Sequence, residues 1–179
     1  MSRSRSILSS RAGAALAACL LALSLATAAS ASTPVSLTIT GGALEITVPA
    51  GPVVLGTIVN TVEGGTVAGP LGVVQVSDAR SAAAGSGWVA TAISTAFTPP
   101  AGPTIAASLV GYTAGAITKV GTATFTATNR TDLTGAIAVV TATGITGDNS
   151  ASWNPTITVT VPGGMASAVY SATITHSVS

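Results

Sequence analysis

The chain has 179 residues, of which 6% are charged and 47% are hydrophobic, and it contains 20 Gly and 9 Pro. Disordered interaction proteins combine high net charge with low hydrophobicity, so this composition excludes that class. Acid/base and hydrolytic chemistry needs His, Cys or paired carboxylates, and the chain offers one His, one Cys and five acidic residues. We therefore expect a non-catalytic protein with a hydrophobic core of ordinary size.

Residues 1–31 have the pattern of a Sec signal peptide. Basic residues precede an uncharged run over residues 12–29 that is rich in Ala and Leu, and the run ends in Ala29-Ser30-Ala31. A positive region, an apolar region and an A-x-A site are typical of a cleaved export signal. We expect cleavage between Ala31 and Ser32, which leaves residues 32–179 as a single secreted domain. The alternative is a membrane anchor, for which the apolar run is short.

A second alternative lies inside this apolar run. Leu16-Ala17-Ala18-Cys19 is similar to a bacterial lipobox, whose cysteine is acylated and holds the protein on the membrane. The residues after Cys19 stay apolar, whereas a lipoprotein normally begins with a polar tether. If the chain is cleaved after Ala31 instead, the exported domain has no cysteine and therefore no disulfide or thiol chemistry.

Removal of residues 1–31 also changes the net charge. Three basic residues then remain against five acidic residues, for a net charge of −2. Nucleic-acid-binding domains rely on clusters of Lys and Arg. The exported domain is therefore predicted to have no nucleic-acid partner.

The chain after the predicted signal favours strands throughout. Apolar residues alternate with Thr and Ser in four runs, a pattern typical of half-buried strands; the runs are Val35/Leu37/Ile39, Leu44/Ile46/Val48, Val74/Val76 and Ile157/Val159/Val161. Clusters such as Gly41-Gly42 and Gly147-Asp148-Asn149 predict turns, and the most helix-like piece, residues 81–84, ends at Gly85. We predict an all-β domain of eight to ten short strands, most simply an antiparallel β-sandwich of the Ig-like or jelly-roll-like kind.

Candidate catalytic residues are few. His176 is the only histidine, and no G-x-S-x-G motif accompanies it to expose a nucleophile. We expect His176 to face solvent on a terminal strand, and we predict no catalytic residue. An enzyme would require Glu45, Asp78 or Asp132 to share a cleft with this histidine.

Metal ligands are equally scarce. Zinc needs three or four ligands from His, Cys or carboxylate groups. Asp148-Asn149 and Asn129/Asp132 lie in turn-like stretches, but they lack the run of alternating oxygen ligands that is typical of a calcium site. The sequence therefore predicts no metal and no cofactor, and these Asx residues are expected to bond to backbone groups.

Trp88 and Trp153 are the only tryptophans. Glycines precede Trp88 at the beginning of a predicted strand, where the ring either packs in the core or lies on the surface. An indole on a strand is more often a core residue, whereas an exposed ring can stack on a sugar ring. Trp88 is therefore the candidate contact for a glycan ligand.

Several segments follow one another in a characteristic order: residues 71–80 (LGVVQVSDAR), 85–88 (GSGW), 112–115 (YTAG), 155–162 (PTITVTVP) and 170–175 (YSATIT). This order, which spans most of residues 35–178, resembles that of the WxL-domain surface proteins of Gram-positive bacteria and their secreted relatives in high-GC bacteria. The resemblance implies a secreted β-sandwich that attaches noncovalently to peptidoglycan, often beside other surface proteins.

The motif that names this family is incomplete in the chain. The first W-x-L is Trp88-Val89-Ala90, and the closing I-T-W-x-L reads Ile174-Thr175-His176-Ser177-Val178. Trp88 is thus the only position onto which the family's binding motif can be carried, and His176 stands where the second tryptophan would be. There is also no L-P-x-T-G sorting motif, so we expect any retention at the wall to be noncovalent.

The sequence thus predicts a secreted, non-catalytic cell-surface protein that associates with peptidoglycan, another wall glycan or a surface protein. The alternative is a structural or adhesin subunit that assembles with itself through strand edges. Low charge and strands rich in Val and Thr favour this alternative, because exposed edges can pair with another chain.

Overall fold

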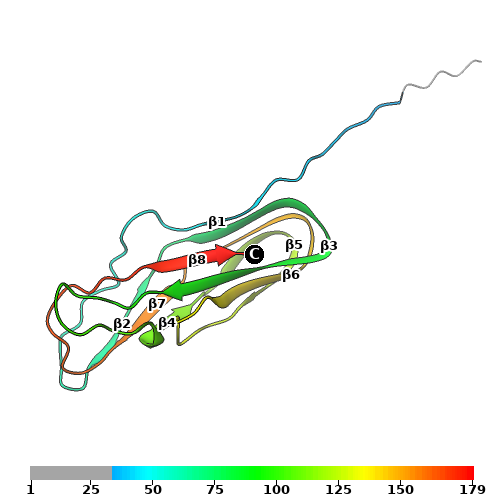
Figure 1. Ribbon diagram of the computed structural model, residues 1–179. Coiled ribbons are helices and arrows are strands. Elements are labelled where there is room, and N and C mark those ends of the chain that lie inside the picture. Colours follow the sequence, from blue (N-terminus) through cyan, green and yellow to red (C-terminus); the bar gives the residue numbers. More distant parts are fainter. Residues whose placement is uncertain (1–33) are drawn as a thin grey trace, which may run out of the picture. The chain divides into compact units, whose positions relative to one another are not determined.

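The computed structural model describes residues 34–179, of which Thr38–Ser179 form one compact unit. The predicted signal peptide, its cleavage at Ala31 and Ser32, and Cys19 lie outside the described residues. The prediction of an all-β domain is confirmed, since the regular structure in this part of the chain is strand apart from one short 3-10 helix (Figure 1). The elements are β1 (Leu44–Thr47), β2 (Gly65–Pro70), β3 (Val74–Ser94), η1 (Ala107–Leu109), β4 (Val110–Thr113), β5 (Ile117–Ala127), β6 (Ile137–Trp153), β7 (Thr156–Val161) and β8 (Ile174–Val178).

The strands form two antiparallel sheets. The larger sheet has the order β1-β3-β6-β5, with β8 also paired to β3, and the smaller sheet has the order β2-β7-β4. Strand β6 pairs along almost the whole of β3, so β1 and β8 share the other edge of β3, at residues 75–78 and 90–94 respectively. The two sheets enclose one core, and the predicted antiparallel β-sandwich is confirmed.

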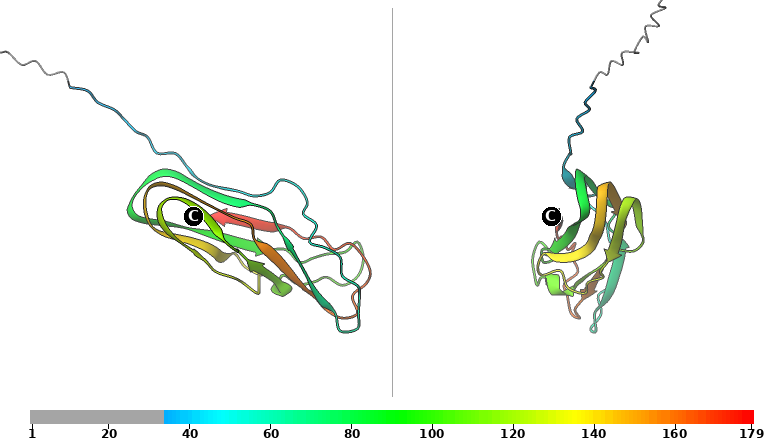
Figure 2. Two further views of the ribbon diagram at one scale, coloured as in Figure 1. Left: turned by 180° about the vertical axis from the view of Figure 1, so that it is seen from behind. Right: turned by 90° about the vertical axis from the view of Figure 1, so that its right-hand side faces the viewer.

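Three long strands bend back on themselves at one end of the sandwich. Strand β3 has 21 residues and β6 has 17, and Figures 1 and 2 show them with β5 as nested arches. The bends coincide with register shifts and with positive φ angles at Ser81, Gly85, Gly121, Gly144 and Gly147. The larger sheet therefore folds over on itself at this end, and β3, β5 and β6 each run through both of its halves.

These arches correct the predicted division into short strands. Val74/Val76 and the segment after Gly85 belong to one strand rather than two, and the helix-like piece at residues 81–84 is part of the bend. The predicted turn at Gly147-Asp148-Asn149 is also wrong, because these residues lie inside β6. The reason is that β-bulges bend a strand and increase its twist without ending it.

Gly121 shows why the bend requires glycine. Its φ is +90°, and a Cβ atom at this position would lie 2.6 Å from the carbonyl oxygen of Asp148 on the neighbouring strand. Strands β5 and β6 can therefore stay close through the bend only without a side chain here.

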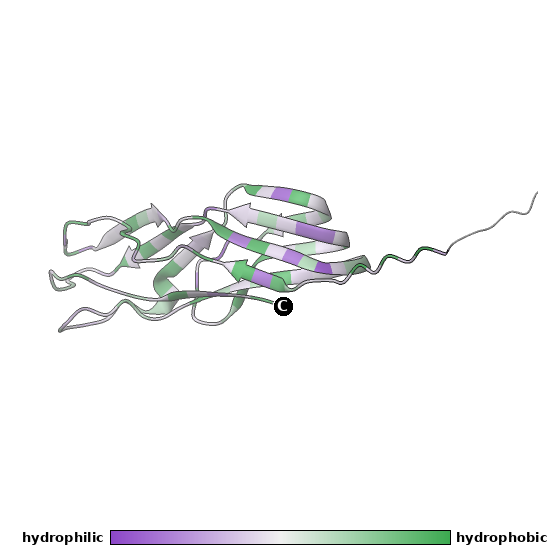
Figure 3. Cartoon of the chain, turned by 90° about the horizontal axis from the view of Figure 1, so that it is seen from above, coloured by the Kyte–Doolittle hydropathy of each residue, from purple (hydrophilic) through white to green (hydrophobic). Residues whose placement is uncertain are grey.

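The core lies between the layers and follows the alternation in the sequence. Hydrophobic and hydrophilic residues alternate along several strands in Figure 3, as expected when one face of each strand is buried. The buried cluster takes residues from β3, β4, β6 and β7 together with Ile105, Ala114, Leu133 and Met165 from the connections. The predicted inward positions Val74, Val76, Ile157 and Val159 all belong to this cluster.

The first predicted strand is not formed. Residues 34–43 have no assigned strand, and the side chains of Val35, Leu37 and Ile39 are 91%, 85% and 80% exposed. Within the described residues, this alternating segment therefore pairs with no other strand, and its apolar side chains stay exposed.

Candidate functional site

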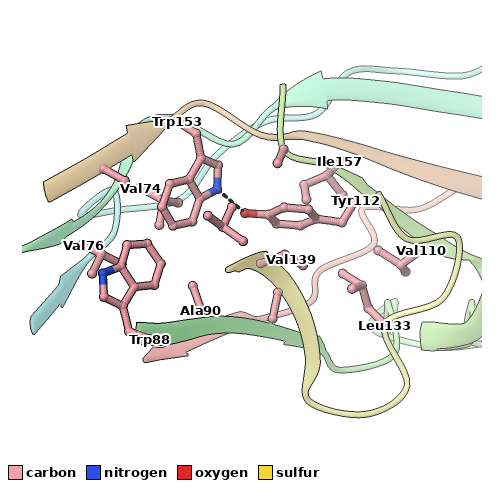
Figure 4. Packing of buried hydrophobic residues seen from close by; sticks show 14 of the residues in the cluster. Val74, Val76, Trp88, Ala90, Val110, Tyr112, Leu133, Val139, Trp153 and Ile157 are labelled. Atoms are coloured by element: carbon pink, nitrogen blue, oxygen red, sulfur yellow. Dashed lines mark hydrogen bonds between the residues drawn. The ribbon is translucent and has the colours of Figure 1, made fainter. Parts of the chain in front are cut away.

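Trp88 lies in the core and not on the surface. It is 2% exposed, and its ring centroid is 5.7 Å from that of Phe125 at a tilted angle. Figure 4 shows the indole among Val74, Val76 and Ala90, between the two layers. We therefore withdraw Trp88 as a ligand contact, because a ring in this position presents no face to a glycan.

The indole nitrogen of Trp88 begins a buried polar network at the bend of the arches. Trp88 Nε1 donates to Asn149 Oδ1 at 2.9 Å, and Asn149 Nδ2 donates to Asp78 Oδ2 at 3.1 Å. Asp78 and Asn149 are direct cross-strand partners on β3 and β6, so their side chains lie next to each other on the same face of the sheet. The network therefore ties one half of β3, at Asp78, to the other half, at Trp88.

Arg80 completes this network from the solvent side. Its Nε donates to Asp78 Oδ1 at 2.8 Å, and its Nη2 donates to Asp78 Oδ2 at 3.0 Å and to the carbonyl oxygen of Gly87 at 3.3 Å. The hydrogen bonds from the Arg80 guanidinium hold the pKa of the Asp78 carboxyl below its ordinary value of 3.8, against the opposing effect of burial. The buried carboxylate of Asp78 is thereby paired with the guanidinium of Arg80, which donates to both of its oxygens.

A second chain of hydrogen bonds links Trp153, Tyr112 and His176 across the sandwich. Trp153 Nε1 donates to the Tyr112 hydroxyl at 2.7 Å, as drawn in Figure 4, and that hydroxyl lies 3.1 Å from His176 Nε2. The Tyr112 oxygen thus accepts from the indole and also contacts the imidazole nitrogen of His176. Trp153, Tyr112 and His176 thus form one connected group of uncharged side chains.

The position of His176 corrects the expectation that this residue faces solvent. Its side chain points inward from β8, and burial lowers the pKa of the imidazole to about 4. His176 Nδ1 is buried without a hydrogen-bond partner among the described residues. Burial also raises the pKa of Tyr112. The neutral imidazole is therefore part of the structural core of the domain.

The buried imidazole should make stability depend on pH. An unfolded histidine has a pKa of 6.5 and this one about 4, so the unfolded chain binds the extra proton between these values, and stability falls as the pH is lowered through that range. The shift corresponds to a loss of about 3 kcal/mol, complete at about pH 4. We expect urea unfolding from pH 7 to pH 4 to show this loss in the wild type. His176→Gln, whose amide oxygen can still accept from Tyr112, should be nearly flat there; an equally steep profile would contradict the assignment.

The structure does not bring together the residues that an enzyme would require, and Glu45 is exposed on β1. Asp78 bonds to Arg80 and Asn149, Asp132 accepts from the Thr134 backbone N–H at 2.7 Å, and among the described residues His176 bonds to Tyr112 rather than to a carboxylate. The cleft that an enzyme would require at His176 is therefore not formed by Asp78 or Asp132.

Three of the four Asx residues that were weighed as calcium ligands, namely Asp132, Asp148 and Asn149, bond to the chain itself. Asp148 Oδ1 accepts from the Ser81 backbone N–H at 2.9 Å, which supports the bend of β3, and Asn149 belongs to the buried network. Within residues 34–179, no group of three or more His, Cys, Asp or Glu side chains is placed to hold a metal ion.

Two open hollows lie on the surface. The first, of about 260 Å³, is next to the bend and is lined by Asp78, Asp148 and Asn149, whose oxygens are already used by Arg80, Ser81 and Trp88. The second, of about 210 Å³, lies over β4 and β7 and is lined by Leu109, Gly111, Tyr112, Thr113, Arg130, Thr131, Thr158 and Thr160. We call the second one the threonine hollow, because its exposed donors and acceptors are mainly threonine hydroxyls.

Sequence reasoning weighed Asn149 only as a calcium ligand and Tyr112 only as part of the segment at residues 112–115, and it did not identify the threonine hollow. The partners of Trp88 and Trp153 are 61 and 41 residues away in the chain, so no local motif connects them. The local indication was weak: Val110 and Tyr112 are two residues apart, so in a strand both side chains lie on the same face, and the apolar Val110 indicates that this face points inward.

No family model, no curated protein and no solved structure matches the chain. The likeness to WxL-domain proteins therefore remains a resemblance of sequence order. No helix in the described part of the chain is long and apolar enough to cross a bilayer.

Proposed function

We propose that the chain is an exported, non-catalytic protein of the cell surface that binds wall peptidoglycan, or another wall glycan, through the threonine hollow. The observation that carries this proposal is the distribution of polar groups. The charged groups Asp78, Arg80 and Asp148 are engaged in holding the bend, whereas the threonine hollow offers free hydroxyls beside a guanidinium. Neutral donors and acceptors on a rigid surface suit the hydroxyl-rich, uncharged parts of a polysaccharide.

The sheet beneath the hollow gives it a fixed shape. Thr158 and Thr160 project from β7, the middle strand of its sheet, which is bonded to β2 and β4. The Arg130 Nε group donates to the carbonyl oxygen of Ala138 at 2.8 Å, and the Arg130 backbone pairs with that of Tyr112. The donors are therefore held in place before a ligand arrives, which lowers the entropy that binding costs.

A pull-down on purified peptidoglycan tests this proposal. We expect the chain from Ser32 onward to be enriched on the sacculi, and Thr160→Glu to bind about tenfold less because it places a bulky anion at the hollow. Thr156→Glu is the matched control, since Thr156 is also exposed on β7 but lies outside the hollow. Equal binding by the two variants, or no enrichment of the wild type, would argue against the hollow as the site.

A second candidate function, a structural subunit that assembles through strand edges, is favoured by a different observation. Residues 35–39 have the alternation of a strand but no strand partner among residues 34–179, and their apolar side chains are exposed. A strand of this kind can be completed by the sheet of another molecule.

A further inference from the structure

Residues 34–40 have the alternating sequence of a β-strand, but their apolar side chains are exposed to solvent. The apolar residues Val35, Leu37 and Ile39 alternate with Ser36 and Thr38, so an extended backbone would place all three on one face. All three are at least 80% exposed. A contiguous apolar face in water is typical of a surface that another molecule covers.

This segment enters the compact unit at one edge of the large sheet. The Gly42 N–H donates to the Ala79 carbonyl, and the Ala79 N–H donates to the Ala43 carbonyl at 3.0 Å, which extends the pairing of β1 with β3 by one step. A Cβ atom on Gly41 would lie 2.6 Å from the carbonyl oxygen of Arg80, so the chain runs close against the bend of β3. The segment thus begins on the β1 edge of the sheet.

The opposite edge of the same sheet is β5, and it is open. Strands β3 and β6 lie between β1 and β5, and among the described residues β5 pairs with β6 alone. Its inward residues Ile117, Ala123 and Phe125 pack against the core but are only partly buried. This edge therefore has both unpaired backbone groups and incompletely covered apolar side chains.

The second half of β5 has fewer of the devices that protect an edge than the first half. Lys119 lies in the first half, with its Nζ 5.9 Å from the Phe125 ring centroid, and the bulge at Gly121 separates the two halves. Lysine and bulges discourage pairing. Residues 122–127 remain; they contain one further register shift, between Thr122 and Thr124, and their six residues are nearly as many as the seven of residues 34–40.

We propose that residues 34–40 of one chain add as a strand to residues 122–127 of β5 in a second copy, where Val35, Leu37 and Ile39 cover Ala123 and Phe125. This inference rests on the second candidate function and names its donor and acceptor. The donor residues extend from the β1 edge of the sheet, and the acceptor is the β5 edge. The contact therefore joins two different surfaces of neighbouring copies, which makes it head-to-tail. Each added copy presents a new free edge, so copies add one after another and form an open filament when the rotation between them does not close a ring.

Sedimentation and electron microscopy of the chain from Ser32 onward test the proposal. We expect the wild type to form oligomers that grow with concentration. Leu37→Glu should stay monomeric, since it places a charge on the apolar face of the donor strand. Its melting temperature should equal that of the wild-type monomer, because Leu37 is 85% exposed in the free chain. Thr38→Glu is the matched control: the adjacent side chain lies on the other face of the donor strand and faces solvent, so assembly should persist.

Two further measurements identify the acceptor. A synthetic peptide of residues 32–41 should bind the Leu37→Glu chain, and the same peptide with Leu37→Glu should not. The chain from Ser32 onward contains no cysteine, so a Leu37→Cys and Ala123→Cys double variant should give a ladder of disulfide-linked species on oxidation. Either single variant can form dimers at most.

Three results would overturn the inference. They are a wild type that stays monomeric at its highest soluble concentration, a Leu37→Glu chain that still assembles, and a double cysteine variant that forms no ladder. The peptidoglycan pull-down is independent of these outcomes, so a monomeric chain that still binds the wall would remove the filament and leave the proposed wall binding in place.

Discussion

Replacement of Trp88 with alanine is expected to lower the free energy of unfolding by about 3–5 kcal/mol. The ring is 2% exposed and fills the space between the two layers at the bend, so its removal leaves a cavity that the arched strands cannot close. The same change leaves the Asn149 carboxamide oxygen without its donor. Urea unfolding followed by circular dichroism measures the loss without relying on the fluorescence of the deleted residue.

Two variants separate the packing of Trp88 from its hydrogen bond. Trp88→Phe keeps most of the ring but loses Nε1, and we expect an intermediate loss of about 1–3 kcal/mol, because Asn149 Oδ1 then stays buried without a partner. Val120→Ala is the control, since Val120 is 67% exposed and should change little. If Trp88→Ala were no more destabilising than this control, the indole would have to lie on the surface, and a glycan contact would return as a hypothesis.

Replacement of Asp78 with asparagine is expected to cost about 2–3 kcal/mol, which is less than a fully buried ion pair because Arg80 is 38% exposed. The Asp78 side chain is fully buried and accepts bonds from Arg80 and Asn149. An asparagine amide in its place turns one acceptor into a donor that faces two other donors. Denaturant unfolding at neutral pH should show the loss.

The pH profile distinguishes this carboxylate from His176. The pKa of folded Asp78 is below its unfolded value of 3.8, so its contribution is present above that value and is lost as the pH falls below it. The wild type should therefore lose stability in acid in two steps, one between pH 6.5 and about 4 from His176 and one below pH 3.8 from Asp78. Asp78→Asn should keep the upper step and show a smaller lower step, part of which remains because hydrogen bonds from Thr134 also hold the pKa of Asp132 below 3.8. A variant that lacked the upper step would contradict this assignment.

The strand positions that were predicted correctly are those where one local pattern decides burial. Leu44/Ile46 in β1, Val74/Val76 in β3 and Ile157/Val159 in β7 all place their apolar residues inward. Period-two alternation in a chain with few charges is enough to predict such strands and an all-β core.

The arches could not be read from the same pattern. Glycine and Asx residues at 85, 147, 148 and 149 are typical of turns, and here they bend strands that continue. What decides between a turn and a bulge is whether the neighbouring strand continues through the same bend, as β5 and β6 do where Gly121 passes the Asp148 carbonyl. That contact joins residues far apart in the chain.

The candidate site was predicted least well. Trp88 was weighed both as a core residue and as a candidate glycan contact, and His176 was expected to face solvent. The structure gives each a buried partner, Asn149 for Trp88 and Tyr112 for His176, and the threonine hollow takes residues from separate segments of the chain.

The sequence alone determined that this is an all-β domain of low charge with few groups suited to catalysis, because composition and alternation act locally and add along the chain. The tertiary structure alone decided that Trp88 is core, that the charged residues Asp78 and Arg80 hold a bend, and that the strand pattern at residues 35–39 is left without a partner. The physical reason is that burial and pairing depend on which distant segments meet. An alternating pattern indicates that a segment can form a strand. Only the other strands of the sheet determine whether that segment pairs within its own chain.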